Sequence, residues 1–162
     1  RGLGDVYKRQ GLPNRLAWMV ELDIALARAR TTGEPLAVLF IDLDGFKPIN
    51  DTYGHETGDA VLCGFGERLR QTLRPEDFVA RLAGDEFVVL LHHVHDASDP
   101  EAVVRKLEYA MRTPLLANAH ALQVTPSIGV SVQYGPHYDI AALMREADVA
   151  MYQVKRAHAA RA

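Results

Sequence analysis

The spacing of apolar residues predicts an N-terminal helix and several later ones. Between residues 12 and 32, apolar side chains recur at helical intervals, and Gly33, Glu34 and Pro35 end the helix. The residues that carry this period are Leu16, Met19, Val20, Ile24 and Ala27. Similar spacing predicts three more amphipathic helices, at residues 61–73, 100–112 and 140–156. Residues 47–58 are rich in Gly, Asn, Asp and Pro, which favours a short helix and a loop.

Continuous and alternating apolar runs predict the strands. Residues 36–43 are apolar almost throughout, which is typical of a buried strand. Residues 78–82 and 86–92 form a predicted β-hairpin around the tight connection Ala83-Gly84-Asp85. Residues 122–133 alternate as a further strand. Because helices and strands interleave around a hairpin, we expect an α+β fold with a mixed or antiparallel sheet.

Length and composition restrict the class of protein. The chain has 162 residues, 48% of them hydrophobic, which is enough for one domain with its own core. Its single cysteine, Cys63, excludes an internal disulfide, and its apolar runs are far too short to span a bilayer. The formal charge of −3 gives no general field for polyanions. We therefore expect a cytoplasmic domain that contacts neither nucleic acid nor membrane and binds phosphate only through local charge or a metal.

Acidic residues cluster at the ends of two predicted strands. Alternation places Asp42 and Asp44 on one face of the first strand, and Asp85 and Glu86 lie in the hairpin. Carboxylates beside so many apolar residues are costly unless a cation or hydrogen bonds satisfy them. Mg²⁺ suits such a place, because it takes one or two carboxylates and completes its shell with water and substrate phosphates. The alternative is that these are turn acids that cap and solvate their loops.

Several other residues are candidates for ligand binding. Gly84 permits positive φ and a close backbone approach to a ligand, although an ordinary turn glycine would look the same. Lys47 and Lys155 could pair with phosphate or could be solvated charges. Asn50 and Asp59 form a donor–acceptor set able to bind a base edge, with loop polarity as the alternative.

Taken together, the motifs of the chain resemble one family, the GGDEF domains or diguanylate cyclases. The resemblance covers Gly11 to Arg156. Its motifs are Gly11-Leu12-Pro13-Asn14-Arg15, Asp42-Leu43-Asp44-Gly45-Phe46-Lys47, Ile49-Asn50-Asp51, Gly54-His55, Gly58-Asp59, Ala83-Gly84-Asp85-Glu86-Phe87, Ser127-Ile128-Gly129-Val130 and Ala150-Met151-Tyr152. The resemblance implies a nucleotidyl-cyclase-like fold, related to the ferredoxin-like arrangement, with a mostly antiparallel central sheet flanked by helices.

The resemblance also implies an activity, the condensation of two GTP into cyclic di-GMP and two pyrophosphates. In that case Asp42, the Leu43 carbonyl and Asp85 would bind Mg²⁺, with Mn²⁺ as an alternative. Asp85 and Glu86 would be the catalytic carboxylates. The substrate would be bound by Lys47, Asn50, Asp59, Gly84 and Lys155. One domain holds one GTP, so the product would require a two-fold homodimer.

The turn before the hairpin matches the family's inhibitory product site. Arg74 and Asp77 have its Arg-x-x-Asp spacing, and cyclic di-GMP would bind there. An arginine can donate paired hydrogen bonds to a phosphate or to the Hoogsteen edge of guanine, while Asp77 can accept hydrogen bonds from guanine N–H groups. The alternative is a helix-terminating turn with a weak surface ion pair.

The chain departs from the family pattern at two places. Ala83 replaces the first glycine of the signature, and His158-Ala159 replaces the usual Gly-Arg after the lysine, which is expected to remove a phosphate contact. Arg161 is the candidate substitute. These departures favour a second hypothesis, a catalytically silent module that binds GTP or cyclic di-GMP within a larger signalling protein, such as a fusion to a phosphodiesterase domain.

The first ten residues join none of these patterns. Residues 1–10 can be encoded by a sequence resembling, codon for codon, the adaptor and transposon end used in short-read sequencing libraries. The alternative is a basic N-terminal arm. We therefore expect residues 11–162 to be a GGDEF domain truncated at its N-terminus, with an upstream sensor or a downstream domain in the full-length protein.

Overall fold

The computed structural model describes residues 11–96 and 98–161. The proposed adaptor segment, residues 1–10, lies outside the described residues. Four strands form one antiparallel sheet in the order β2-β3-β1-β6. Their bounds are Leu36–Asp44 for β1, Phe78–Ala83 for β2, Glu86–Leu91 for β3 and Thr125–Gln133 for β6. The expected α+β class and antiparallel sheet are confirmed.

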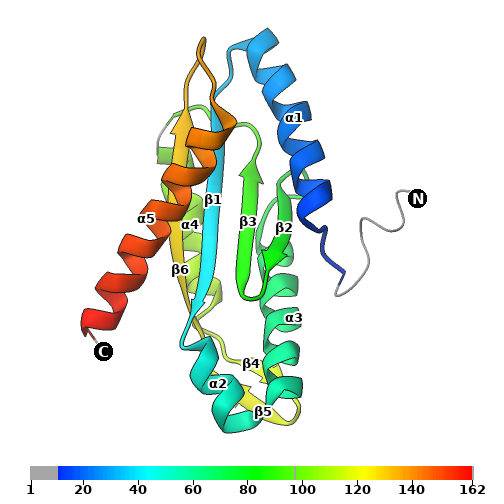
Figure 1. Cartoon of the computed structure of the whole chain (residues 1–162), viewed down its shortest axis with the longest axis vertical. Coiled ribbons are helices and arrows are strands. Elements are labelled where there is room, and N and C mark those ends of the chain that lie inside the picture. Colours follow the sequence, from blue (N-terminus) through cyan, green and yellow to red (C-terminus); the bar gives the residue numbers. More distant parts are fainter. Residues whose placement is uncertain (1–10, 97, 162) are drawn as a thin grey trace.

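Helices cover both faces of this sheet (Figure 1). The helices are α1 (Arg15–Thr32), α2 (Phe46–Tyr53), α3 (His55–Thr72), α4 (Ser98–Ala110) and α5 (Ile140–Arg161). Helices α1 and α5 pack on one face, where Trp18 and Ala147 bury themselves against strand residues such as Val88. Helices α3 and α4 pack on the other face, around Phe65 and Leu107. In the described part of the chain, no helix combines the length and apolarity needed to cross a bilayer.

Helix α1 confirms the predicted helix but buries a different face. Asn14 caps its N-terminus by accepting the Ala17 N–H at 3.1 Å, and Gly33 ends it with φ 75°. The apolar residues that carried the predicted period are largely exposed: Leu16, Met19, Val20 and Ile24. The buried face is instead formed by Ala17, Trp18, Leu22, Ala25 and Ala29. Both sets fit a helical period, and the small alanines allow the close approach to the sheet.

The region between α4 and β6 differs from the single strand predicted over residues 122–133. Strands β4 (Leu115–Ala117) and β5 (His120–Leu122) form a separate two-stranded hairpin, and β6 begins at Thr125. The hairpin packs against the helices beyond the end of β1, since Tyr53 contacts His120 with ring centroids 4.8 Å apart. Three-residue strands are too short to show an alternating pattern, which explains the missed hairpin.

Helix α5 lies unusually close to β6. A Cβ atom at Gly129 would come within 2.1 Å of the Met151 backbone nitrogen and 2.2 Å of the Ala147 carbonyl oxygen. Only glycine therefore permits this backbone-to-backbone contact. The helix continues to Arg161, five residues beyond the predicted end at Arg156, and its last turns reach the end of β1. This packing places α5 side chains beside the acidic strand end.

Candidate functional site

The candidate site lies where four segments meet at one end of the sheet. There β1 ends, the β2–β3 turn reverses, β6 begins and the C-terminal half of α5 passes (Figure 1). The antiparallel register pairs Asp42 with Glu86 and with Ser127 on the two neighbouring strands. The two acidic clusters identified in the sequence are thus brought together at one strand end.

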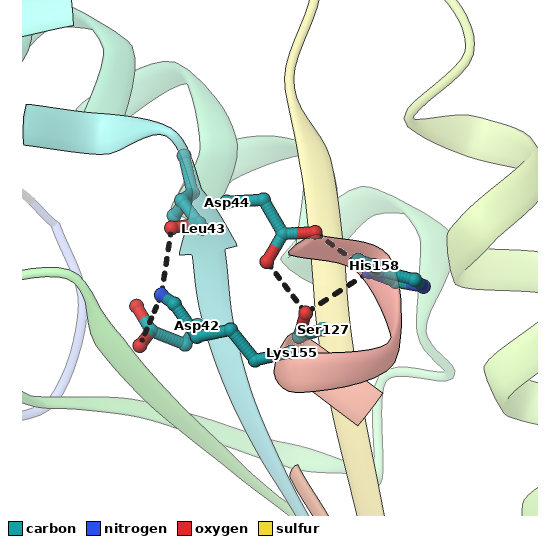
Figure 2. A network of polar contacts seen from close by, with 6 residues as sticks. All are labelled: Asp42, Leu43, Asp44, Ser127, Lys155 and His158. Carbon is teal, nitrogen blue, oxygen red and sulfur yellow. Dashed lines mark hydrogen bonds and ion pairs between the residues drawn. The ribbon is translucent and has the colours of Figure 1, made fainter. Parts of the chain in front are cut away.

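Lys155 of α5 binds the first carboxylate of this cluster. Its Nζ donates to Asp42 Oδ2 at 2.8 Å and to the Leu43 carbonyl oxygen at 3.3 Å (Figure 2). The side chain of Asp42 is only 14% exposed, and its other oxygen, Oδ1, is buried without a hydrogen-bond partner. A positive charge therefore lies on the two groups expected to bind a cation, and one carboxylate oxygen remains unpartnered.

Asp85 and Glu86 lie in an environment that disfavours their charged forms. Burial raises the pKa of Asp85 to about 6, and the nearby carboxylate of Asp42 adds to the shift. Burial also raises the pKa of Glu86, with the charges of Asp148 and Asp42 acting in the same direction. A carboxyl group with a pKa near 6 can accept and release a proton close to neutral pH.

Asp44, two residues beyond Asp42, is bound on both oxygens. Its Oδ1 accepts from Ser127 Oγ at 2.5 Å, and its Oδ2 lies 2.7 Å from His158 Nδ1 (Figure 2). Ser127 Oγ and His158 Nδ1 are 3.1 Å apart, so the three side chains form a closed set. The sequence motifs marked Ser127 only as part of a strand and His158 only as a departure. Their role depends on contacts across more than 30 residues of sequence.

The residues present fit a hard divalent cation. The buried, unpartnered Asp42 Oδ1, the Leu43 carbonyl and the adjacent Asp85 carboxyl are oxygen donors of the kind that Mg²⁺ prefers. Among residues 11–96 and 98–161, no three His, Cys, Asp or Glu side chains converge tightly enough to hold a metal alone. A cation here would therefore need the backbone carbonyl and ligands from water or phosphate, as Mg²⁺ commonly does.

The predicted base-binding residues lie on the two helices that follow β1. Asn50 is half-buried on α2, and Asp59 is exposed near the start of α3. The Asn50 side chain lies directly against Gly58, because a Cβ atom at that position would be 1.7 Å from Asn50 Oδ1. Gly58, the residue before Asp59, thus allows the amide to lie against the start of α3. Lys47 is exposed in the first turn of α2.

Beside the acidic cluster is a hollow of about 540 Å³ with positive side chains along it. It is lined by Asp44 and Gly45 from the end of β1 and by Lys155, His158 and Arg161 from α5, among others. Arg161, the candidate substitute for the missing arginine, thus lines the same hollow as Lys155. At the hairpin, Gly84 has φ 46°, and no described atom lies within 4 Å of where its Cβ would be. The backbone there is open to a ligand.

Arg74 and Asp77 occupy the turn between α3 and β2, away from the acidic cluster. Asp77 Oδ2 accepts from the Arg74 backbone N–H at 3.2 Å, and Oδ1 accepts from the His92 backbone N–H at 3.0 Å. The carboxylate therefore stabilises the turn, and no ion pair joins it to the Arg74 guanidinium within the described residues. Both residues line a separate hollow of about 160 Å³.

Comparison with known proteins identifies relatives of this chain. Residues 10–161 match the family described as "Diguanylate cyclase, GGDEF domain". The chain is 43% identical over 147 residues to diguanylate cyclase TpbB of Pseudomonas aeruginosa, covering 90% of this chain and 34% of that protein. It is 39% identical to the bifunctional diguanylate cyclase/cyclic di-GMP phosphodiesterase MucR of the same species, covering 89% of this chain and 21% of MucR.

Solved structures show the same fold. The crystal structure of the TpbB GGDEF domain superimposes with a TM-score of 0.86 at 41% identity, covering 91% of this chain and 92% of that one. The GGDEF domain of DgcB from Caulobacter crescentus, in complex with c-di-GMP, gives 0.86 at 28% identity, covering 97% and 92%. The chain spans about a fifth to a third of the curated relatives named above. By its sequence motifs, its α+β nucleotidyl-cyclase-like fold and these matches, the chain belongs to the GGDEF family of diguanylate cyclase domains.

Proposed function

We propose that this domain condenses two GTP molecules into cyclic di-GMP and two pyrophosphates. The observation that carries the proposal is the pair of neighbouring carboxyl groups, Asp42 and Asp85, with an unpartnered buried oxygen and Lys155 at the same strand end. This arrangement supplies oxygen ligands, a proton acceptor and a positive charge within one site. Those are the groups that phosphoryl transfer requires.

Asp42, the Leu43 carbonyl and Asp85 would hold Mg²⁺ or Mn²⁺. When bound, the cation would offset the negative charge of the phosphates and of the attacking oxygen. Lys155 already lies on two of these groups, so it is placed to move from Asp42 to a phosphate oxygen of the substrate. Lys47 on α2 and Arg161 on α5 would add positive charge to the phosphates.

The acidic cluster would handle the proton of the attacking hydroxyl. The 3′ oxygen of one GTP forms a bond to the α-phosphorus of the other, and the bond from that phosphorus to pyrophosphate breaks. The hydroxyl proton passes to a carboxylate, and Asp85, whose pKa is raised by burial in the metal-free domain, is the first candidate to accept it. A bound cation would lower the pKa of both the carboxyl group and the hydroxyl. Glu86, also shifted upward in pKa, is the second candidate. The same step on the second hydroxyl closes the ring.

Asn50 and Asp59 would select guanine. A carboxylate accepts from the guanine N1–H and N2–H groups, whereas adenine offers no donor at those positions. The packing of Asn50 against Gly58 supports this role, since it holds the amide against the helix that carries Asp59. Gly84 would let the hairpin backbone approach the nucleotide closely.

Two features would complete the catalytic cycle. Each domain supplies one GTP site, so we propose that a two-fold homodimer is the active form. Cyclic di-GMP would bind at Arg74 and Asp77 and hold two domains apart, so that the product inhibits its own synthesis. The curated relatives are much longer than this chain, which supports an upstream sensor or a downstream domain in the full protein.

The decisive experiment is incubation of the domain, fused to a dimerising coiled coil, with GTP and Mg²⁺. Chromatography should detect cyclic di-GMP and pyrophosphate. Asp85→Asn should abolish turnover while leaving the fold intact, because an amide is a poor metal ligand and a poor base. Absence of product from the folded parent domain, beside an active control enzyme, would contradict the proposal.

The second candidate function is a silent GTP- or cyclic di-GMP-binding module. Ala83 in the signature and Ala159 in place of arginine favour it. It predicts tight nucleotide binding by calorimetry without product formation in the assay above. Product formation excludes it.

A further inference from the structure

The two aspartates at the end of β1 differ in how their oxygens are satisfied. Asp42 keeps one buried oxygen without a partner, whereas both oxygens of Asp44 are bound, by Ser127 and by His158. Ser127 is fully buried, and the side chains of Asp44 and His158 are 21% and 34% exposed. The Asp44 contacts are therefore partly buried, on the wall of the hollow beside the acidic cluster.

A protein donor and a metal ion compete for the same carboxylate oxygens. Withdrawing Asp44 from this set would leave the buried Ser127 hydroxyl without its acceptor, which is unfavourable. Donors from two other elements, β6 and α5, thus hold Asp44. Asp42 instead shares Lys155 with the Leu43 carbonyl, the other group expected to bind a cation. Strand alternation alone would have presented both carboxylates equally.

We propose that His158, together with Ser127, is a positioning residue that reserves Asp44 and so directs the divalent cation to Asp42. His158 stands where the family pattern has glycine, so the device belongs to this chain. The inference rests on the proposed function only in assigning a cation to Asp42. Without the imidazole, Asp44 would become available as an additional ligand, and the ion would be shared between Asp42 and Asp44.

The test measures Mn²⁺ binding to the 162-residue chain without nucleotide, by electron paramagnetic resonance at pH 8. His158→Ala should raise Mn²⁺ affinity on the order of ten-fold, the effect of one added carboxylate ligand. His158→Asn, whose amide N–H can replace Nδ1–H, should keep the parental affinity.

A double-mutant cycle separates this role from a loosening of Lys155. If His158 acts through Asp44, His158→Ala should change Mn²⁺ affinity less than about two-fold in an Asp44→Asn background. If it acts by releasing Lys155 from Asp42, the gain should be equal in both backgrounds, and that result would overturn the proposal. Arg156→Ala, which removes an exposed charge from the same helix, gives the size of the long-range charge effect.

Two further measurements keep the inference independent of folding and of turnover. Melting curves identify any variant that fails to fold. Ser127→Ala, which removes the other donor to Asp44, should also raise Mn²⁺ affinity in the chain that retains Asp44. Failure of every variant, or of the parent, to bind Mn²⁺ contradicts the proposal. If the parent and the variants bind Mn²⁺ as expected but the domain makes no cyclic di-GMP, the proposed function is contradicted and the role of His158 is not.

Discussion

Replacing Gly129 by alanine is expected to push α5 away from the sheet and to disrupt the site. The new Cβ would lie 2.1 Å from the Met151 nitrogen, 2.2 Å from the Ala147 oxygen and 2.7 Å from the Met151 Cα. All three atoms are backbone, so no side-chain rotation relieves the overlap. Ordinary contacts lie near 3.5–4 Å, and the helix must therefore move outward by more than about 1 Å.

This displacement affects both stability and chemistry. Overpacking of this kind costs about 1–3 kcal/mol, which corresponds to a melting temperature lower by roughly 2–12 °C in a domain of this size. Lys155 lies one helical turn beyond Met151, and its bonds to Asp42 and Leu43, at 2.8 and 3.3 Å, do not survive a shift of 1 Å. We expect kcat/KM for GTP to fall on the order of 10–100-fold.

The assay compares thermal melting and GTP turnover of Gly129→Ala with those of Gly64→Ala. Gly64 lies inside α3, where an added Cβ meets only Leu115 Cδ2 at 3.6 Å, an ordinary contact. Gly64→Ala should therefore stabilise the domain by about 0.5–1 kcal/mol, because alanine favours the helix. If Gly129→Ala melts and turns over like the parent, the close approach of α5 does not position Lys155.

Three further predictions concern single residues of the site. The folded-state pKa of Asp85, about 6, exceeds its ordinary value of 3.8, so folding favours the protonated carboxyl. The protonated carboxyl of Asp85 therefore contributes stability that is fully present below pH 3.8 and is lost as the pH rises through about 6. In metal-free buffer, the melting temperature of Asp85→Asn should fall less between pH 4 and pH 7 than that of the parent. Asp59→Asn should reduce the preference for GTP over ATP by about 1–3 kcal/mol in competition binding, and an unchanged preference would refute the guanine contact. Arg74→Ala should weaken inhibition by added cyclic di-GMP and leave the initial rate largely unchanged; equal inhibition of variant and parent would make this turn purely structural.

The sequence predicted the elements that carry long or alternating apolar runs. Strand β1, the β2–β3 hairpin and helices α3 and α5 form where expected, because a buried strand or an amphipathic helix requires those patterns. Cys63 lies within the apolar pattern of α3 but is exposed. The buried face of α3 is set by residues such as Val61 and Phe65, and position 63 points away from it. Periodicity identified the helix, whereas packing decided its orientation.

The candidate site was predictable in its residue types and only partly in its connections. The resemblance implied that Asp42 and Asp85 share a cation, which requires them to lie near one another. The partners of Asp42 and Asp44 come from α5, more than 100 residues away in sequence. No local pattern encodes that Lys155 binds Asp42 while His158 binds Asp44. It depends on the rotation of α5 about its axis, which the contact at Gly129 fixes.

The three carboxyl groups at this strand end differ in their partners, and these differences indicate which of them is suited to bind a cation and which to accept a proton. Both oxygens of Asp44 are bound by fixed partners on β6 and α5, so it is a poor ligand for a cation that arrives later. Asp42 is neutralised by Lys155, a long side chain with three rotatable donors, which can leave when a stronger cation or a phosphate enters. Asp85 instead has a pKa raised by burial and by the nearby Asp42 carboxylate. Of the three carboxyl groups, the one with an exchangeable partner is suited to bind a cation, and the one with the raised pKa is suited to accept a proton.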